Sequence, residues 1–230
     1  KGDVEVKIDG KAANDQATIS TDKNTLTVAF AEKAVKANAG KSIEVTFKAK
    51  IREGANLLDY LVPGQGIRIP NKASYDIDHN PKFHKDSNEV PVTPPSPEQP
   101  PIEKDVNDKA EATLEARDEE FTYHVKTKIP YEATAFNITD TLKDVLDFSG
   151  EKGQAEATVD GKKLSDDHIT INGQTITVTL NQEELKANAD KEIKLTFKAK
   201  IRPNANLAAY VVGDKVVINN QASYNVDLPD

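Results

Sequence analysis

Short runs in which apolar and polar residues alternate recur along the whole chain. An alternating run places its apolar side chains on one face, as a half-buried β-strand requires. The predicted strands share this pattern, have turn residues between them, and comprise residues 4–8, 25–30, 43–51, 66–69, 73–77, 102–106, 120–129, 135–142, 155–159, 175–180, 193–201 and 216–226. Many short strands at this spacing predict an all-β chain built from β-sandwiches.

Two short helices are predicted between these strands, at residues 31–39 and 182–189. Asn181 precedes the second helix, and Glu184 follows three residues later. An asparagine in this position accepts a hydrogen bond from a first-turn amide, while the glutamate reaches back to the asparagine amide. This pattern predicts a capped start for the second helix.

One segment of the chain occurs twice, at residues 9–78 and 160–227. Both copies contain the run TFKAKIR, at residues 46–52 and 196–202. A repeat of this length indicates tandem units of one fold rather than an enzyme with a unique cleft. The second copy is preceded by predicted strands, within residues 102–142, that the first copy lacks.

The region between the copies differs in composition from both. Residues 81–101 contain seven prolines and few apolar residues, which predicts a stiff, extended, proline-rich linker. We therefore expect residues 1–80 to be the C-terminal portion of a first repeat and residues 102–230 to be one complete domain. The opening strands of the first repeat are expected upstream of Lys1 or from another segment or molecule.

Charge and hydropathy argue against two classes of partner, nucleic acids and membranes. The net charge is −8, so nucleic-acid phosphates would be repelled unless a basic stripe overrode the field. The repeated FKAKIR run alternates, so its basic residues are interpreted as the solvent face of a strand. No apolar run approaches bilayer length, and membrane insertion is not expected.

The chain contains no cysteine, which excludes disulfides, thiolate catalysis and cysteine-ligated metals. His79 and His84 are close in sequence but lack a third ligand nearby, so we predict no metal site there. No phosphate-binding glycine loop or paired-carboxylate cleft follows from the spacing, and no cofactor is expected.

Three polar residues occupy predicted strands where an apolar side chain would be usual. They are Lys104 in the opening strand of the second unit, Asp140 within ITDTL, and Asn220 within INNQASY in the closing strand. First and last strands of an all-β domain often lie together, so these side chains can meet. On spacing alone, three independent surface residues remain the alternative.

These motifs, in this order and in tandem units, resemble the isopeptide-forming domains of Gram-positive surface adhesins and fimbrial shaft proteins, of the collagen-adhesin A type. The resemblance covers residues 102–230 fully and residues 1–78 in their second half. It implies tandem immunoglobulin-like β-sandwiches on the bacterial surface, in a stalk or shaft whose full-length protein is anchored to the cell wall. Adjacent repeats of the same protein are the implied partners.

The resemblance also implies an intramolecular amide bond between Lys104 and Asn220, with Asp140 as the catalytic acid. Burial disfavours charge, so an enclosed lysine becomes a neutral nucleophile while an enclosed aspartic acid keeps its proton. The acid can then polarise the Asn220 carbonyl and pass a proton to departing ammonia. We expect this self-directed reaction and no enzyme activity toward another substrate.

Lys109 and Asn219 are the rival nucleophile and acceptor. Asn220 is preferred because it aligns with Asn71 of the first copy, and because alternation places Asn220 on the inward face. Asn71 is therefore the equivalent acceptor of the first repeat. We expect it to be unreacted without its missing strands.

Two alternatives belong to other functional classes. A module that binds a host extracellular-matrix protein would use exposed aromatic residues, for which Tyr60, Tyr131 and Tyr210 are the candidates. A carbohydrate-active enzyme would need two carboxylates across a groove, such as Asp140 and Glu120. Nothing in the sequence brings these two carboxylates together.

Overall fold

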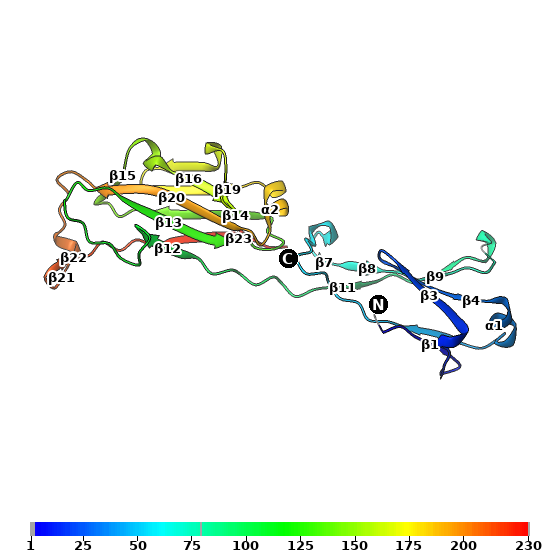
Figure 1. Ribbon diagram of the computed structural model, residues 1–230. Helices are drawn as coiled ribbons and strands as arrows, with labels where there is room; N and C mark the ends of the chain where they lie inside the picture. The colour runs from blue at the N-terminus through cyan, green and yellow to red at the C-terminus, as the bar shows by residue number, and fades with distance from the viewer. Residues whose placement is uncertain (1–2, 79, 230) are drawn as a thin grey trace. The chain divides into compact units, whose positions relative to one another are not determined.

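The computed structural model describes residues 3–78 and 80–229, and contacts divide the chain into two units, Lys1–Ala55 and Asn56–Asp230 (Figure 1). His79, one of the two histidines considered as metal ligands, lies outside the described residues. Antiparallel strands make up most of the regular structure of the described residues, and both α-helices are short. The all-β prediction is therefore confirmed.

The first unit contains strands at the three predicted positions, residues 4–8, 25–30 and 43–51, and two further strands that were not predicted, Lys11–Ala12 and Ala17–Asp22. Its elements are β1 (Glu5–Ile8), β2 (Lys11–Ala12), η1 (Asn14–Gln16), β3 (Ala17–Asp22), β4 (Thr25–Phe30), α1 (Glu32–Ala37) and β5 (Ile43–Thr46). β1 lies between β2 and β5 in one sheet, and β3 pairs with β4 in another. The strand predicted over residues 43–51 ends at Thr46 instead.

Residues 56–92 form hairpins. Their elements are η2 (Leu58–Tyr60), β6 (Leu61–Val62), β7 (Gly66–Ile67), β8 (Ile69–Asn71), β9 (Ser74–Tyr75), η3 (Pro81–Phe83), β10 (Lys85–Asp86) and β11 (Val90–Val92). β11 pairs with β8, and β10 pairs with β9. Part of the segment expected to be a linker is therefore paired, and residues 93–102 have no helix or strand.

The larger sheet of the second unit has the predicted opening strand, residues 102–106, at one edge. Its strands are β12 (Glu103–Val106), β13 (Phe121–Lys128), β15 (Leu146–Phe148), β16 (Glu156–Val159), β17 (Lys162–Lys163) and β20 (Glu192–Ile201). The order is β12-β13-β20-β16-β17, and β15 also pairs with β20. In Figure 1 the long strands β13 and β20 run side by side through this sheet.

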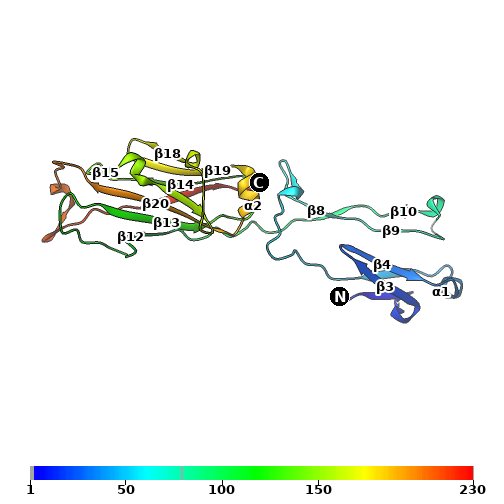
Figure 2. The same cartoon turned by 45° about the horizontal axis from the view of Figure 1, so that its top comes forward.

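The second sheet has the order β18-β19-β14-β23; β18, β19 and β14 are labelled in Figure 2. Its strands are β14 (Ala135–Thr141), β18 (Ile169–Asn172), β19 (Thr175–Leu180) and β23 (Ala222–Asp227). The connections contain η4 (Glu151–Gln154), η5 (Asp166–His168), α2 (Gln182–Asn188), η6 (Ala208–Tyr210), β21 (Val211–Val212) and β22 (Lys215–Val216). The strand predicted over residues 216–226 is thus divided between β22 and β23.

The inward faces of these two sheets form one apolar core, as alternating strands require. Its largest fully buried side chains come from both sheets and from α2, and include Phe136, Phe197, Ile129, Ile138, Leu146, Ile176, Leu185, Ile193 and Leu195. Asn181 and Glu184 form the predicted capping box at the start of α2. Residues 102–227 of the second unit therefore form a β-sandwich with a continuous interior.

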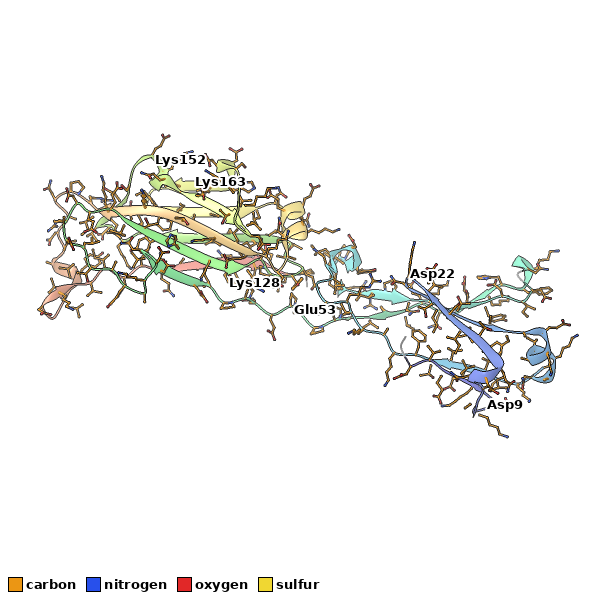
Figure 3. All side chains as sticks on the ribbon, viewed as in Figure 1. Asp9, Asp22, Glu53, Lys128, Lys152 and Lys163 are labelled. Atoms are coloured by element: carbon orange, nitrogen blue, oxygen red, sulfur yellow. The ribbon has the colours of Figure 1, made fainter. Side chains whose placement is uncertain are left out.

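The charged side chains labelled in Figure 3 are all exposed. Within the described residues, no helix combines the length and the apolar character needed to cross a bilayer. An ionisable side chain in the core is unusual, because removing a charged group from water is unfavourable unless the group is paired. Asp140 is such a residue.

Candidate functional site

Lys104 and Asp140 enter the core of the second unit from different sheets. Lys104 lies on β12, opposite Val125 of β13. Asp140 lies on β14, opposite Ala222 of β23. β12 and β23 are therefore not paired side by side as first and last strands. Their residues approach each other through the space between the sheets.

Asn220 precedes β23 by two residues rather than lying in a regular strand. This offset makes Asn220 a diagonal neighbour of Asp140, a position from which polar side chains can reach one another. Asn220 is half-buried and Asn219 is exposed. The predicted alternation therefore holds across Ile218, Asn220 and Ala222, whose side chains are all less exposed than those of Asn219 and Gln221.

The carboxylate of Asp140 contacts both other predicted site residues. Lys104 Nζ donates a hydrogen bond to Asp140 Oδ2. Asn220 Nδ2 donates to Asp140 Oδ1 over 2.7 Å. The structure thus brings Lys104, Asp140 and Asn220 together at one carboxylate, with the amine on one oxygen and the carboxamide on the other.

Asp140 is 1% exposed, and the lysine side chain is also largely buried. Burial lowers the pKa of Lys104, because a low-dielectric interior disfavours the ammonium form. The charge of Asp140 and its hydrogen bond oppose this effect without cancelling it. Lys104 therefore gives up its proton more readily than a lysine in water.

Two aromatic rings flank the amine and were not identified from the sequence. Lys104 Nζ lies 4.1 Å from the ring centre of Tyr123 and 5.5 Å from that of Phe197. Burial, followed by the negative charge of Asp140, raises the pKa of Tyr123 to about 12, so the phenol stays neutral. Alternation in β13 and β20 identifies both rings as inward-facing, but only the sheet register places them beside Lys104.

The carbonyl oxygen of Asn220 is unusual among the polar atoms of the core. Asn220 Oδ1 is buried and has no hydrogen-bond partner among the described residues. A buried acceptor without a partner is unfavourable by about 1 to 3 kcal/mol. The carbon bonded to this oxygen, Asn220 Cγ, is the atom that an amine would attack.

The rival residues lie elsewhere. Lys109 is exposed in the turn that closes on Val106. Asn71 is exposed on β8, opposite Val90, in the first copy. Glu120 accepts a hydrogen bond from Ser149, whereas Asp140 accepts hydrogen bonds from Lys104 and Asn220. The two carboxylates therefore share none of these partners.

The tyrosines considered for host binding differ in exposure. Tyr60 is exposed, whereas Tyr131 and Tyr210 are half-buried. The Tyr210 hydroxyl donates to Asp144 over 2.7 Å. Tyr60 is therefore the most accessible of the three.

Comparison with known proteins places residues 99–228 in a family. The model of the Sgo0707 N2 domain family matches residues 99–228, a range that includes Lys104, Asp140 and Asn220. The chain is also 99% identical over all 230 residues to a segment of Platelet adherence protein A from Streptococcus gordonii. It spans 6% of that protein's length. The resemblance to Gram-positive surface adhesins is therefore confirmed.

Solved structures with related strand arrangements come from bacterial surface proteins. The pilus backbone RrgB of Streptococcus pneumoniae matches 56% of this chain and 31% of its own chain, at 24% identity and a TM-score of 0.43. The N-terminal domain of the Streptococcus gordonii adhesin Sgo0707 matches 56% and 29%, at 21% identity and 0.40. The Bacillus cereus major pilin BcpA matches 100% and 69%, at 21% identity and 0.43.

Proposed function

The chain belongs to the Sgo0707 N2 domain family, and on that premise we propose that it is a stalk segment of a bacterial cell-surface adhesin, stabilised by an autocatalytic amide bond between Lys104 and Asn220. Asp140 acts as the proton shuttle. Residues 102–230 form the cross-linked domain, and residues 1–80 belong to a neighbouring repeat. The segment lies outside the cell, in a longer protein attached to the wall.

The observation that supports this proposal is the contact of Lys104 and Asn220 with opposite oxygens of one buried carboxylate. Such a contact holds an amine and a carboxamide at one carboxylate that is shielded from water. Positioning two groups in this way removes much of the entropic barrier to their reaction. The Oδ1 atom of Asn220 is buried without a partner among the described residues, which makes the unreacted carboxamide less stable than one in water.

The reaction begins with proton transfer from the Lys104 ammonium to Asp140 Oδ2, which leaves a neutral amine and a neutral acid. The amine nitrogen attacks Cγ of Asn220, and a C–N bond forms. Asp140 passes a proton to Nδ2 and receives one from Nζ, so the bond from Cγ to Nδ2 breaks and ammonia leaves. In balance, a primary amine and a carboxamide give a secondary amide and ammonia.

The environment of Lys104 favours the first step. Burial lowers the pKa of its amine, so a larger fraction is neutral at a given pH than for a lysine in water. The rings of Tyr123 and Phe197 lie beside the nitrogen, and Tyr123 stays neutral. In this proposal the nucleophile, the acceptor and the acid all come from the one domain.

The bond would join β12 to the segment before β23, which belong to opposite sheets. Tension entering near Ile102 and leaving near Asp227 would pass through the cross-link and bypass the loop between Lys104 and Asn220. In the chain-entropy model used for disulfides, closing a loop of about 100 residues stabilises a fold by about 4 to 5 kcal/mol. A chain without cysteine would gain a covalent staple in this way.

Intact mass under denaturing conditions tests the bond. The purified chain should be lighter than its calculated mass by one ammonia, and proteolysis should release a branched peptide that contains both Lys104 and Asn220. The variants Lys104→Ala, Asp140→Ala and Asn220→Ala should each have their full calculated mass. Full mass in the unsubstituted chain would refute the bond.

The controls are the rival residues. Lys109→Ala, Asn219→Ala and Asn71→Ala should each retain the loss of one ammonia. Asp140→Asn keeps the shape of the site and removes the proton shuttle, so it separates catalysis from packing. Circular dichroism of each variant shows whether the domain has folded.

The second candidate is a module that binds the host surface, and the observation in its favour is the name of the 99% identical protein. In this alternative the exposed Tyr60 contributes to a docking surface. Flow cytometry with the fluorescently labelled chain and human platelets distinguishes the two ideas. A stalk segment should not bind, whereas saturable binding that Tyr60→Ala weakens would favour the module.

A further inference from the structure

Asp105, Asp108 and His124 bring three potential metal ligands together on the solvent side of β12 and β13. One ligand atom from each residue lies within 4.8 Å of the other two. His124 Nδ1 is 2.7 Å from Asp105 Oδ1 and 3.4 Å from Asp108 Oδ1. Both carboxylates therefore approach the same nitrogen of the imidazole.

Backbone structure holds the three side chains in this arrangement. Asp105 on β12 lies directly opposite His124 on β13. Asn107 and Asp108 form the two-residue turn after β12, with positive φ angles of 51° and 60°, and the Asp108 amide donates to Asp105 Oδ1 over 3.1 Å. The side chain of Asn107 accepts a hydrogen bond from the Thr122 amide over 2.8 Å. The turn thus folds Asp108 back over the strand pair.

His84 provides a contrasting arrangement in the same chain. Its Nδ1 lies 2.7 Å from Asp76, and its Nε2 lies 3.2 Å from Asp86. These carboxylates bind opposite sides of the ring, so one ion cannot contact all three residues. At His124 both carboxylates face one ring nitrogen. Zinc binds nitrogen and oxygen ligands at about 2.0 to 2.2 Å, so tetrahedral ligands lie about 3.4 Å apart. The separation of His124 from Asp108 fits this geometry, and the 2.7 Å hydrogen bond from His124 to Asp105 would lengthen when the ion binds.

We propose that Asp105, Asp108 and His124 bind one divalent transition-metal ion of the zinc class. The donor set is one imidazole nitrogen and two carboxylate oxygens, which suits zinc better than calcium or magnesium. Water completes the coordination sphere. Asp108 is 86% exposed and gives the ion access from solvent, whereas His124 is 12% exposed and fixed in the sheet.

The position of this site gives the metal a structural role. Asp105 directly follows Lys104, and the side chains of the two residues lie on opposite faces of β12. An ion held by Asp105, Asp108 and His124 would fasten β12 to its turn and to β13 from the outside. None of the three ligands takes part in the proposed amide bond, so the metal site and the bond can be tested independently.

Isothermal titration calorimetry with ZnCl₂ at neutral pH tests the proposal on the whole chain. We expect one strong equivalent of zinc, and an affinity about tenfold or more lower after Asp108→Ala or His124→Ala, because even outer-shell substitutions reduce metal affinity 10- to 100-fold. His84→Ala is the matched control and should leave this equivalent unchanged. Cobalt in place of zinc reports the ligands through its visible absorption.

Either of two results would overturn the site. One is the absence of zinc binding at millimolar concentration, and the other is binding that survives His124→Ala and disappears in His84→Ala. Asp108 is exposed in a turn, so Asp108→Ala tests the ligand set without disturbing the core. Circular dichroism verifies that the His124→Ala protein is folded.

Discussion

The two copies of the repeated segment present the same side chains in opposite environments. Phe197 is completely buried, and its counterpart Phe47 is 45% exposed. Ile193 is completely buried, and its counterpart Ile43 is 56% exposed. The copies share the run TFKAKIR, so sequence within the repeat does not account for this difference.

The difference comes from the strands that flank each copy. β20 pairs with β13 over eight residues, including Tyr123 opposite Phe197 and Thr127 opposite Ile193. β5 pairs with β1, and no described strand lies along its other edge. A strand is stabilised by its neighbours rather than by its own alternation. The corresponding segment is therefore a ten-residue strand, Glu192–Ile201, in one copy and a four-residue strand, Ile43–Thr46, in the other.

The largest expected difference between the copies concerns their asparagines. Asn220→Ala should remove the proposed cross-link and destabilise the second unit by about 4 to 5 kcal/mol, because the unfolded chain regains the entropy of an open loop. Asn71→Ala, at an exposed position, should change stability by less than about 0.5 kcal/mol. Denaturant unfolding of both variants measures the contrast. Equal changes in stability for the two variants would show that no cross-link at Asn220 stabilises the second unit.

Matched isoleucines test the difference in burial. Ile193→Ala should destabilise the second unit by about 2 to 5 kcal/mol, through lost burial and a new cavity. Ile43→Ala should have an effect within about 0.5 kcal/mol in this chain. Hydrogen exchange of β20 and β5 locates the effect of each substitution. A large effect of Ile43→Ala would mean that its face is covered in solution.

The two α-helices differ in their N-terminal caps, and substitutions there should change stability less than the isoleucine substitutions do. Asn181 and Glu184 form a capping box at α2, whereas Ala31 at the start of α1 provides no side-chain cap. Asn181→Ala should destabilise its unit by about 1 kcal/mol, and Ala31→Asn should stabilise α1 by a similar amount. Thermal unfolding of the two variants measures both signs. An unchanged Asn181→Ala protein would show that the capping box does not stabilise α2.

The smallest expected difference between the copies is in the pH dependence of their stability, and it involves His168. Ile169 pairs with Val178 as Ile19 pairs with Val28, so the residue that corresponds to His168 in the first copy is Thr18. Burial lowers the pKa of His168, but hydrogen bonds to Glu184 and to the Ser165 carbonyl outweigh burial and raise it above 6.5. A raised pKa means that the folded state binds the proton more tightly. The resulting stability is complete below the unfolded pKa and is lost as pH rises through the folded pKa.

His168→Thr should therefore flatten the stability of the second unit between about pH 5 and about pH 8. Unfolding midpoints measured across this range provide the test. A slope that persists in the variant would assign the pH dependence to another group. Thr18→His is not expected to create the same slope, because the acidic partner Glu184 belongs to the second copy.

The alternating pattern identified the longest strands, β13 and β20, and both α-helices, but it missed β3 (Ala17–Asp22) and β18 (Ile169–Asn172). The strands at residues 25–30 and 175–180 have the predicted bounds, and α2 begins at its predicted cap. These elements are fixed by local signals, namely period-two alternation, turn residues and a capping asparagine. The expected strand over residues 43–51 was wrong beyond Thr46, because its length depended on a neighbour that a local pattern does not reveal.

The sequence by itself determined which residue types can react or bind, and it determined the inward orientation of Asn220 relative to Asn219. Only the tertiary structure decided that Lys104 and Asn220 meet at Asp140, because this contact joins residues of opposite sheets. It also decided that Tyr123 and Phe197 enclose the amine, and that Asp105, Asp108 and His124 converge. Alternation fixes the face on which a side chain lies, whereas register and sheet packing fix what that side chain touches.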